Sequence, residues 1–279
     1  MPIDLDEYRQ ASYENWGRIA ANWDSEREWI YGATGAVSER LVERLDAQAG
    51  DTVLDLAAGT GDTGYMVLDR IGPRGKLIST DFAPSMVDAA RRVGEQLGLE
   101  NVEYRVLDAE NLNLEDSSID GVLCRFGYML MADPAAALAE TRRVLKGGGR
   151  LSFAVWTAPE ENLWASVPGR VLVQRGHLPP PEPGMPGIFA MADPERIREL
   201  VKGAGFGEPE IEGVKVEWPY EDVDEHWGFT MKLAGPLADK VRTLEEDERE
   251  AVRSEVRSQI EPLMGSGGVK GRVHVVTAS

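Results

Sequence analysis

A glycine-rich loop is the first feature of this sequence that could do chemistry. The segment VLDLAAGTGDTG covers residues 53–64, and its glycines match the pattern G-x-G-x-x-G. The loop follows a predicted buried strand at 52–56 and precedes a predicted helix at 61–70, the context in which such a loop binds a nucleotide-type ligand. Its glycines let the backbone turn sharply and approach that ligand closely. The alternative is a tight strand-to-helix turn that binds nothing.

Asp55 lies at the end of that strand and indicates which charge the ligand carries. A dinucleotide places its pyrophosphate at this turn, over a helix N-terminus, where a buried carboxylate would repel it. A ligand with a cationic amine would be attracted instead, directly or through water. The sequence therefore favours a ligand with an amine over NAD.

Two further aspartates follow Asp55 at nearly equal intervals along the chain. Asp81 comes twenty-six residues after Asp55, and Asp108 comes twenty-seven residues after Asp81, each where a predicted strand ends. At such positions Asp81 can accept both hydroxyls of a ribose, and Asp108 can accept from an adenine amine. Each aspartate alone could be a turn or helix-cap residue. Together they point to one edge of a sheet, where ligands of open α/β sheets bind.

The elements that must position these residues alternate along the chain. Strands are predicted at 52–56, 76–80, 102–107, 118–124, 149–156, 210–218 and 271–278, and helices at 61–70, 84–97 and 133–145. Alternation of this kind predicts parallel β-α-β units. The expected fold is α/β, a Rossmann-like, doubly wound and mostly parallel seven-stranded sheet whose last strand is antiparallel.

Composition excludes several classes of protein. The 279 residues carry 30 basic and 48 acidic side chains, a net charge of −18, which disfavours nucleic acid and anionic membranes as partners. No apolar stretch reaches the length of a membrane span, about 18 residues. One cysteine, Cys124, allows neither an intrachain disulfide nor a cysteine zinc site, and three scattered histidines predict no metal. The expected location is cytoplasmic, as a monomer or a homodimer.

Four segments resemble a class I S-adenosylmethionine-dependent methyltransferase: LDLAAGTG, STDFAPSMVDAARR, VLDAENLNLEDSSIDGVLC and ALAETRRVLKGGGRLSFAVW. The resemblance covers roughly residues 34–156 and is greatest to the ubiquinone/menaquinone-biosynthesis C-methyltransferase-like group, methyltransferase type 11. It implies S-adenosyl-L-methionine as the methyl donor and S-adenosyl-L-homocysteine as the product. By position, the resemblance implies that the donor is bound by Asp55, Ala57, Gly59, Thr60, Gly61, Asp81, Phe82, Met86, Asp108, Ala109, Glu110 and Arg125.

The resemblance also sorts these residues by the part of the donor that each would contact. Asp55 and the loop that follows it would hold the methionine part, and Asp81 the ribose. Phe82 and Met86 would lie beside the adenine, whose amine and ring edge would meet Asp108. Arg125 is a departure, because this group often has a small cofactor-contacting residue at that position.

Regions outside this core are predicted to cover it. Residues 1–50 would form a helical lid, in which Trp16 and Trp23 either fold over the cofactor or pack the helices. Residues 51–218 and 270–279 would form the S-adenosylmethionine-binding core. Residues 219–269 would form a helical cap, with 160–192 contributing to the acceptor pocket. The alternative is a bundle that only buries a sheet edge.

Methyl transfer is an in-line displacement, so the protein has chiefly to align donor and acceptor and, if required, remove a proton. The acceptor pocket is expected above residues 125–131 and under the cap. His177 and His226 are the candidate general bases, and Tyr128 is a candidate acceptor-site residue; the alternative for each histidine is an exposed loop position. Further candidate walls are Trp156, Trp164, Phe189, Trp227 and Phe229.

The leading hypothesis is methyl transfer to a small, aromatic or lipophilic acceptor. An NAD(P)-dependent oxidoreductase and a non-catalytic S-adenosylmethionine-binding module stay open as alternatives. A nucleic-acid methyltransferase is disfavoured by the acidic surface and by the sequence CRFG at 124–127, where base methylases have N/D-P-P-Y/F/W. A protein acceptor stays open.

Overall fold

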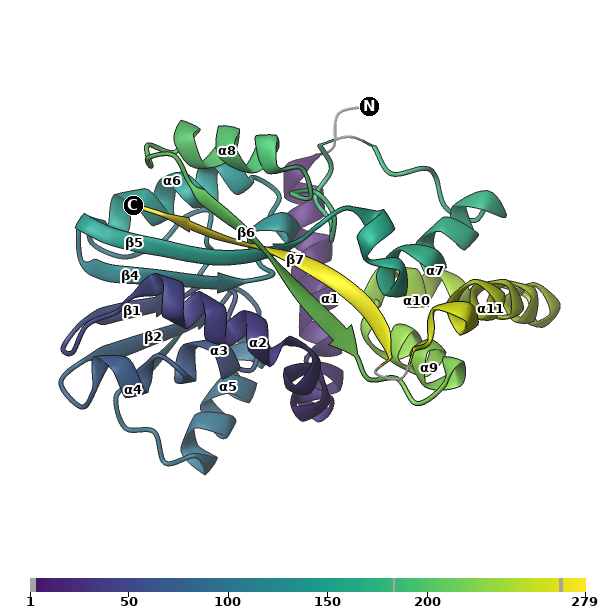
Figure 1. Ribbon diagram of the computed structural model, residues 1–279, viewed down its shortest axis with the longest axis horizontal. Coiled ribbons are helices and arrows are strands. Elements are labelled where there is room, and N and C mark those ends of the chain that lie inside the picture. The colour runs from purple at the N-terminus through teal and green to yellow at the C-terminus, as the bar shows by residue number, and fades with distance from the viewer. Residues whose placement is uncertain (1–3, 183, 266–267) are drawn as a thin grey trace.

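A seven-stranded sheet forms the centre of the computed structural model, which describes residues 4–182, 184–265 and 268–279 (Figure 1). The strands are β1 Thr52–Asp55, β2 Lys76–Asp81, β3 Val102–Val106, β4 Ile119–Arg125, β5 Leu145–Trp156, β6 Glu210–Trp218 and β7 Val269–Ala278. Their order is β3-β2-β1-β4-β5-β7-β6, and β7 runs antiparallel to both of its neighbours. The predicted fold class is confirmed.

Helices cover the sheet and its carboxyl edge. They are α1 Leu5–Ser25, α2 Arg27–Leu45, α3 Asp62–Tyr65, α4 Leu68–Ile71, α5 Pro84–Gln96, α6 Pro134–Val144, α7 Leu163–Gln174, α8 Pro194–Gly203, α9 Val223–Leu233, α10 Gly235–Arg242 and α11 Glu246–Ile260. In Figure 1, α7 and α9 to α11 gather at one end of the molecule, beyond the carboxyl ends of β4 and β5. Helix α1 contacts α5 on one side and α9 and α10 on the other, so it bridges the core and this helical group.

The helix predicted at 61–70 is two one-turn helices, α3 and α4. Gly64 lies within α3, and glycine is a weak helix former. A Cβ at Gly64 would lie 2.5 Å from an oxygen of the Asp55 side chain, so the glycine leaves room for that carboxylate. The glycine that makes room for the Asp55 carboxylate therefore comes at the cost of a continuous helix here.

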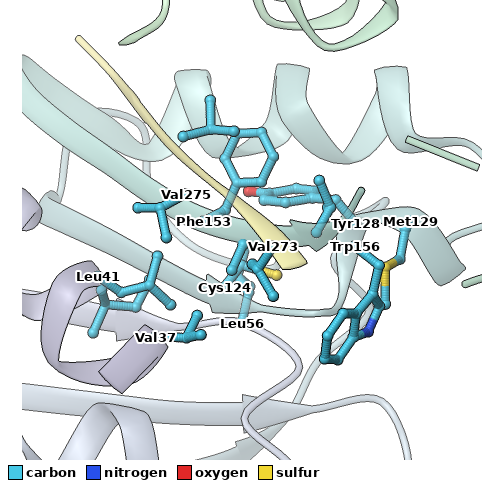
Figure 2. Packing of buried hydrophobic residues seen from close by; sticks show 14 of the residues in the cluster. Val37, Leu41, Leu56, Cys124, Tyr128, Met129, Phe153, Trp156, Val273 and Val275 are labelled. Atoms are coloured by element: carbon cyan, nitrogen blue, oxygen red, sulfur yellow. The ribbon is translucent and has the colours of Figure 1, made fainter. Parts of the chain in front are cut away.

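The core lies between the sheet and its covering helices. Figure 2 shows Val37 and Leu41 of α2 beside Leu56 and Cys124, with Tyr128 and Phe153 further along the sheet. Val37 and Leu41 are fully buried, so α2 is part of the core rather than a mobile cover. Burial of side chains of this size stabilises a fold by about 1.5–3 kcal/mol each.

Candidate active site

The loop after β1 has an unusual backbone, as the glycine pattern predicted. Ala57, Gly59 and Gly61 have φ values of 51°, 57° and 89°, all in the left-handed region. Two of the three are glycines, which adopt this conformation without steric cost. Ala57 does not have that freedom, and strain at a non-glycine residue of this kind costs of order 1–3 kcal/mol and is typical of functional sites.

Asp55 is a buried carboxylate that lacks a full set of partners. Its side chain is 1% exposed. Within the described residues, Oδ2 of Asp55 has no hydrogen-bond partner. Burial raises the pKa of Asp55 to about 7, against the opposing effect of the nearby Arg125 guanidinium. A buried polar atom without a partner and a shifted pKa both indicate a site that a ligand completes.

Asp81 ties the loop to the end of β2. Its Oδ2 accepts from the Gly59 N–H at 3.1 Å, and its Oδ1 accepts from the Ala83 N–H at 3.0 Å. Burial raises the pKa of Asp81 to about 6. The two backbone donors fix the orientation of the carboxylate, and each oxygen keeps a further lone pair for a ligand hydroxyl.

A cleft of about 330 Å³ opens beside this carboxylate, at the ends of β2 and β3. It is lined by Asp6, Arg9, Gln10, Tyr13, Phe82, Val106 and Asp108. The Tyr13 ring meets Phe82 edge-on with centroids 6.0 Å apart. Val106 is 51% exposed, which is high for an apolar strand residue. The structure therefore brings Phe82 and Asp108 together around a surface that suits a flat, partly apolar group with an amine.

Other residues of the predicted donor set lie behind this cleft. Met86 is 2% exposed and forms a small cluster with Ala83 and Ala20, against which Trp16 and Trp23 pack. Ala109 is buried. The Glu110 carboxylate accepts from Arg9 at 2.6 Å, so it holds helix α1 in place. Because α1 supplies both tryptophans and the Tyr13 wall of the cleft, its position fits the lid that the sequence predicted.

An aromatic cluster covers the other half of the sheet edge. It consists of Trp29, Phe126, Trp156, Trp164, Trp218, Tyr220 and Phe229. Phe126 has a φ of 63° and stacks on Trp156 with centroids 4.5 Å apart, so its unusual backbone conformation aims the ring at the cluster. The ring pairs of the described residues include neither Phe189 nor Trp227, although the sequence placed both in the pocket wall.

Of the three candidate acceptor-site residues, only His226 contacts this aromatic cluster. Tyr128 is fully buried; its hydroxyl pairs with Thr141 at 2.6 Å, and Figure 2 shows its ring in the core. Its burial corrects the prediction that it faces the acceptor. The sequence could not show this, because residues 128–130 form a 3-10 turn that directs the ring inward.

The histidines are also in structural positions. Nε2 of His177 lies 2.6 Å from a Glu248 oxygen, which joins the end of α7 to α11. His226 is fully buried, and its Nε2 donates to the Trp164 carbonyl at 2.7 Å. Burial lowers the pKa of His226. Its ring packs on Tyr220 at the outer end of the aromatic cluster, so His226, unlike His177, is in contact with that cluster. A role of either histidine as general base stays a prediction.

A glycine-rich loop, three strand-end aspartates and a Rossmann-like sheet define the class of S-adenosylmethionine-dependent methyltransferases. The chain belongs to the ubiE/COQ5 methyltransferase family, whose sequence model matches residues 19–165. The match covers β1 to β5 and ends within α7.

Curated relatives agree with this family. The chain is 31% identical over 213 residues to a demethylmenaquinone methyltransferase of Deinococcus radiodurans, covering 73% of this chain and 88% of the relative. It is 35% identical over 186 residues to the demethylmenaquinone methyltransferase of Thermus thermophilus, covering 63% and 83%.

A solved structure supports the fold alone. Phosphoethanolamine N-methyltransferase 2 of Haemonchus contortus, in complex with S-adenosyl-L-methionine, superposes with a TM-score of 0.57 at 16% identity, covering 92% of this chain and 56% of that one. No helix in the described part of this chain combines the length and the apolar character needed to cross a bilayer.

Proposed function

We propose that this methyltransferase binds S-adenosylmethionine at the carboxyl ends of β1 to β3 and methylates a small, aromatic or lipophilic acceptor beside β4 and β5. The observation that carries the proposal is the buried Asp55 carboxylate, whose Oδ2 lacks a partner next to the glycine loop. A pyrophosphate would be repelled there, whereas the ammonium of a methionine group would complete the site. The oxidoreductase alternative has no comparable support.

Each part of the donor has matching groups in the protein. Asp55 would receive the ammonium, and the turn at Gly59 and Gly61 would follow the amino-acid chain. The fixed Asp81 carboxylate would accept from the ribose hydroxyls. The adenine would enter the cleft between Phe82 and Asp108. The bound donor supplies an electrophilic methyl group on a sulfonium sulfur.

The aromatic cluster supports an acceptor with a flat apolar body. Its rings stand over the ends of β4 to β6. Gly127, which follows Phe126 of the cluster, lies against the loop after β1, because a Cβ at Gly127 would lie 2.8 Å from the Ala57 Cβ. Aromatic pairs gain about 0.5–1.5 kcal/mol beyond their buried area, so an aromatic acceptor would be favoured. The two relatives named as demethylmenaquinone methyltransferases support a quinol among such acceptors. Alignment and exclusion of water would then supply most of the rate.

We propose covers for the donor and for the acceptor that differ in one respect from the predicted lid of residues 1–50. Helix α1 alone is the lid, because α2 packs on β4 to β7 as part of the core. Helices α9 to α11 lie within residues 219–269 and would cap the acceptor. Opening of α1 would admit the donor.

The test is transfer of a labelled methyl group from S-adenosylmethionine to a panel of reduced quinols, phenols and amines. The expected result is label in a hydroxylated aromatic compound. Label in aliphatic amines only would overturn the acceptor class. Binding of S-adenosylhomocysteine without transfer to any compound would point to a binding module, and binding of NAD in its place would overturn the whole proposal.

A further inference from the structure

Arg125 ends β4 with a guanidinium that is held firmly in one place. Its Nη1 donates to Thr34 Oγ1 at 2.8 Å and to Ser38 Oγ at 3.2 Å, both on α2. Ser38 shares a further hydrogen bond of 2.9 Å with Thr63 of α3. Figure 1 shows α2 beside α3, so this network fixes the guanidinium next to the helix that follows the glycine loop.

This cation has only neutral partners. Within the described residues, no carboxylate oxygen lies within the 4.0 Å of an ion pair from its nitrogens. The nearby Asp62 is engaged by Arg27, with Nε and Oδ1 2.7 Å apart. Burial lowers the pKa of Arg125. Asp62 and Asp55 favour the charged form of Arg125 from beyond ion-pair distance, so a ligand anion that meets the guanidinium directly would still be stabilised.

A carboxylate with a free oxygen stands on the neighbouring strand. Strands β1 and β4 are paired in parallel, with Asp55 opposite Leu123, so Asp55 and Arg125 reach the same edge of the sheet. Oδ2 of Asp55 has no hydrogen-bond partner in the described part of the chain, and Arg125 opposes the rise in the pKa of Asp55. One negative and one positive group, neither of them in an ion pair, therefore lie at the same edge of the sheet.

We propose that Arg125 binds the α-carboxylate of the donor's methionine part while Asp55 receives its ammonium. The two side chains carry opposite charges at one edge of the sheet and would together recognise an amino-acid zwitterion. The inference rests on the proposed function. It assigns Arg125 to the donor rather than to an anionic oxygen of the acceptor.

The experiment compares three ligands by calorimetric titration: S-adenosylhomocysteine, its decarboxylated analogue, and 5′-methylthioadenosine, which lacks the whole amino-acid part. Arg125→Gln should weaken the binding of S-adenosylhomocysteine by about 10- to 150-fold, the usual range for loss of a hydrogen bond to a charged group. The same variant should bind the other two ligands with nearly unchanged affinity. Arg125→Lys should recover part of the loss, because it keeps the charge.

Arg142→Gln is the matched control. The Arg142 guanidinium also lies over an aromatic ring, Phe206, at 5.7 Å, close to the 5.9 Å of Arg125 over Phe126. This variant should bind all three ligands like the wild type, and thermal melting should show both variants folded.

Three outcomes would overturn the inference or its basis. Equal weakening of all three ligands by Arg125→Gln would show a structural role in docking α2. Unchanged binding of S-adenosylhomocysteine with a raised KM for the acceptor would place the arginine at the acceptor. Failure of the wild type to bind S-adenosylhomocysteine would refute the proposed function itself.

Discussion

The carboxyl edge of the sheet has two halves with different chemistry. At the ends of β1 to β3 lie buried carboxylates and backbone donors. The Asp81 carboxylate, for example, accepts hydrogen bonds from the N–H groups of Gly59 and Ala83. At the ends of β4 to β6 lie stacked rings, from Phe126 to Trp218. The polar half offers directional bonds that select one ligand. The aromatic half offers apolar area, which in our proposal accepts a class of flat molecules.

The family match does not separate the two halves. It covers residues 19–165, which include β1 to β5 and four rings of the aromatic cluster, and it leaves out β6, β7 and the helices α8 to α11. We therefore expect this chain to differ from its relatives most in the part of the aromatic half that β6 and α9 supply.

Removal of the Asp81 carboxylate should have the largest effect. Asp81→Ala removes charge-assisted hydrogen bonds to the donor, worth about 1.5–3 kcal/mol, and frees the backbone donors of Gly59 and Ala83. Titration with S-adenosylhomocysteine should show a loss of at least about tenfold in affinity. The exposed Asp116→Ala is the control and should bind normally. Wild-type affinity in a folded Asp81→Ala protein would show that the donor lies elsewhere.

The second-largest effect should come from a change in the protonation state of Asp55. Its pKa of about 7 leaves the carboxylate mostly protonated at pH 6, and only the ionised form would attract the ammonium. Affinity for S-adenosylhomocysteine should therefore rise by about tenfold from pH 6 to pH 8. Asp55→Asn should reduce this dependence to the smaller part that Asp81, with a pKa of about 6, contributes. A flat profile in the wild type would separate Asp55 from the ammonium.

The same group acts in the opposite direction on the stability of the free protein. Its pKa is raised in the folded state, so the stability it contributes is present at low pH and is lost as pH rises through about 7. Thermal melts without ligand should thus show this contribution decreasing from pH 6 to pH 8, while melts with saturating S-adenosylhomocysteine should not.

The sequence brings the three carboxylates of the polar half together, but it names only part of the aromatic half: Trp156, Trp164 and Phe229. Asp55, Asp81 and Asp108 follow three parallel strands, and the carboxyl ends of such strands must meet at one edge. The aromatic pairs join rings that are far apart in the chain, such as Trp29 and Trp218, and no local pattern selects them. Fully buried His226 shows the same limit, because burial depends on what packs against its helix.

A substitution in the aromatic half should leave the affinity for the donor unchanged. Trp164→Leu removes ring contacts to Trp156 and Trp218, each worth about 0.5–1.5 kcal/mol. In methyl-transfer kinetics, kcat/KM for an aromatic acceptor should fall about three- to tenfold, while the affinity for S-adenosylhomocysteine stays the same. An equal loss of donor affinity would mean that the two halves are one site.

The ion pair that attaches α1, the proposed lid, should give the smallest effect. Arg9 is 36% exposed where it pairs with Glu110, so solvent screens the pair, and such pairs contribute about 0–1 kcal/mol. Arg9→Ala should speed release of S-adenosylhomocysteine in stopped-flow measurements by about two- to fivefold. High salt should reduce the difference between variant and wild type. A slower release would mean that the ion pair does not hold α1 closed.

Hydrogen–deuterium exchange tests the division into two halves most directly. Saturating S-adenosylhomocysteine should protect residues 56–61, 81–86 and 106–110 together with α1, and leave residues 156–164 and 216–229 unchanged. Subsequent addition of an aromatic acceptor should protect these last two segments. Protection of 156–164 and 216–229 by S-adenosylhomocysteine alone, with none at the glycine loop, would contradict the account.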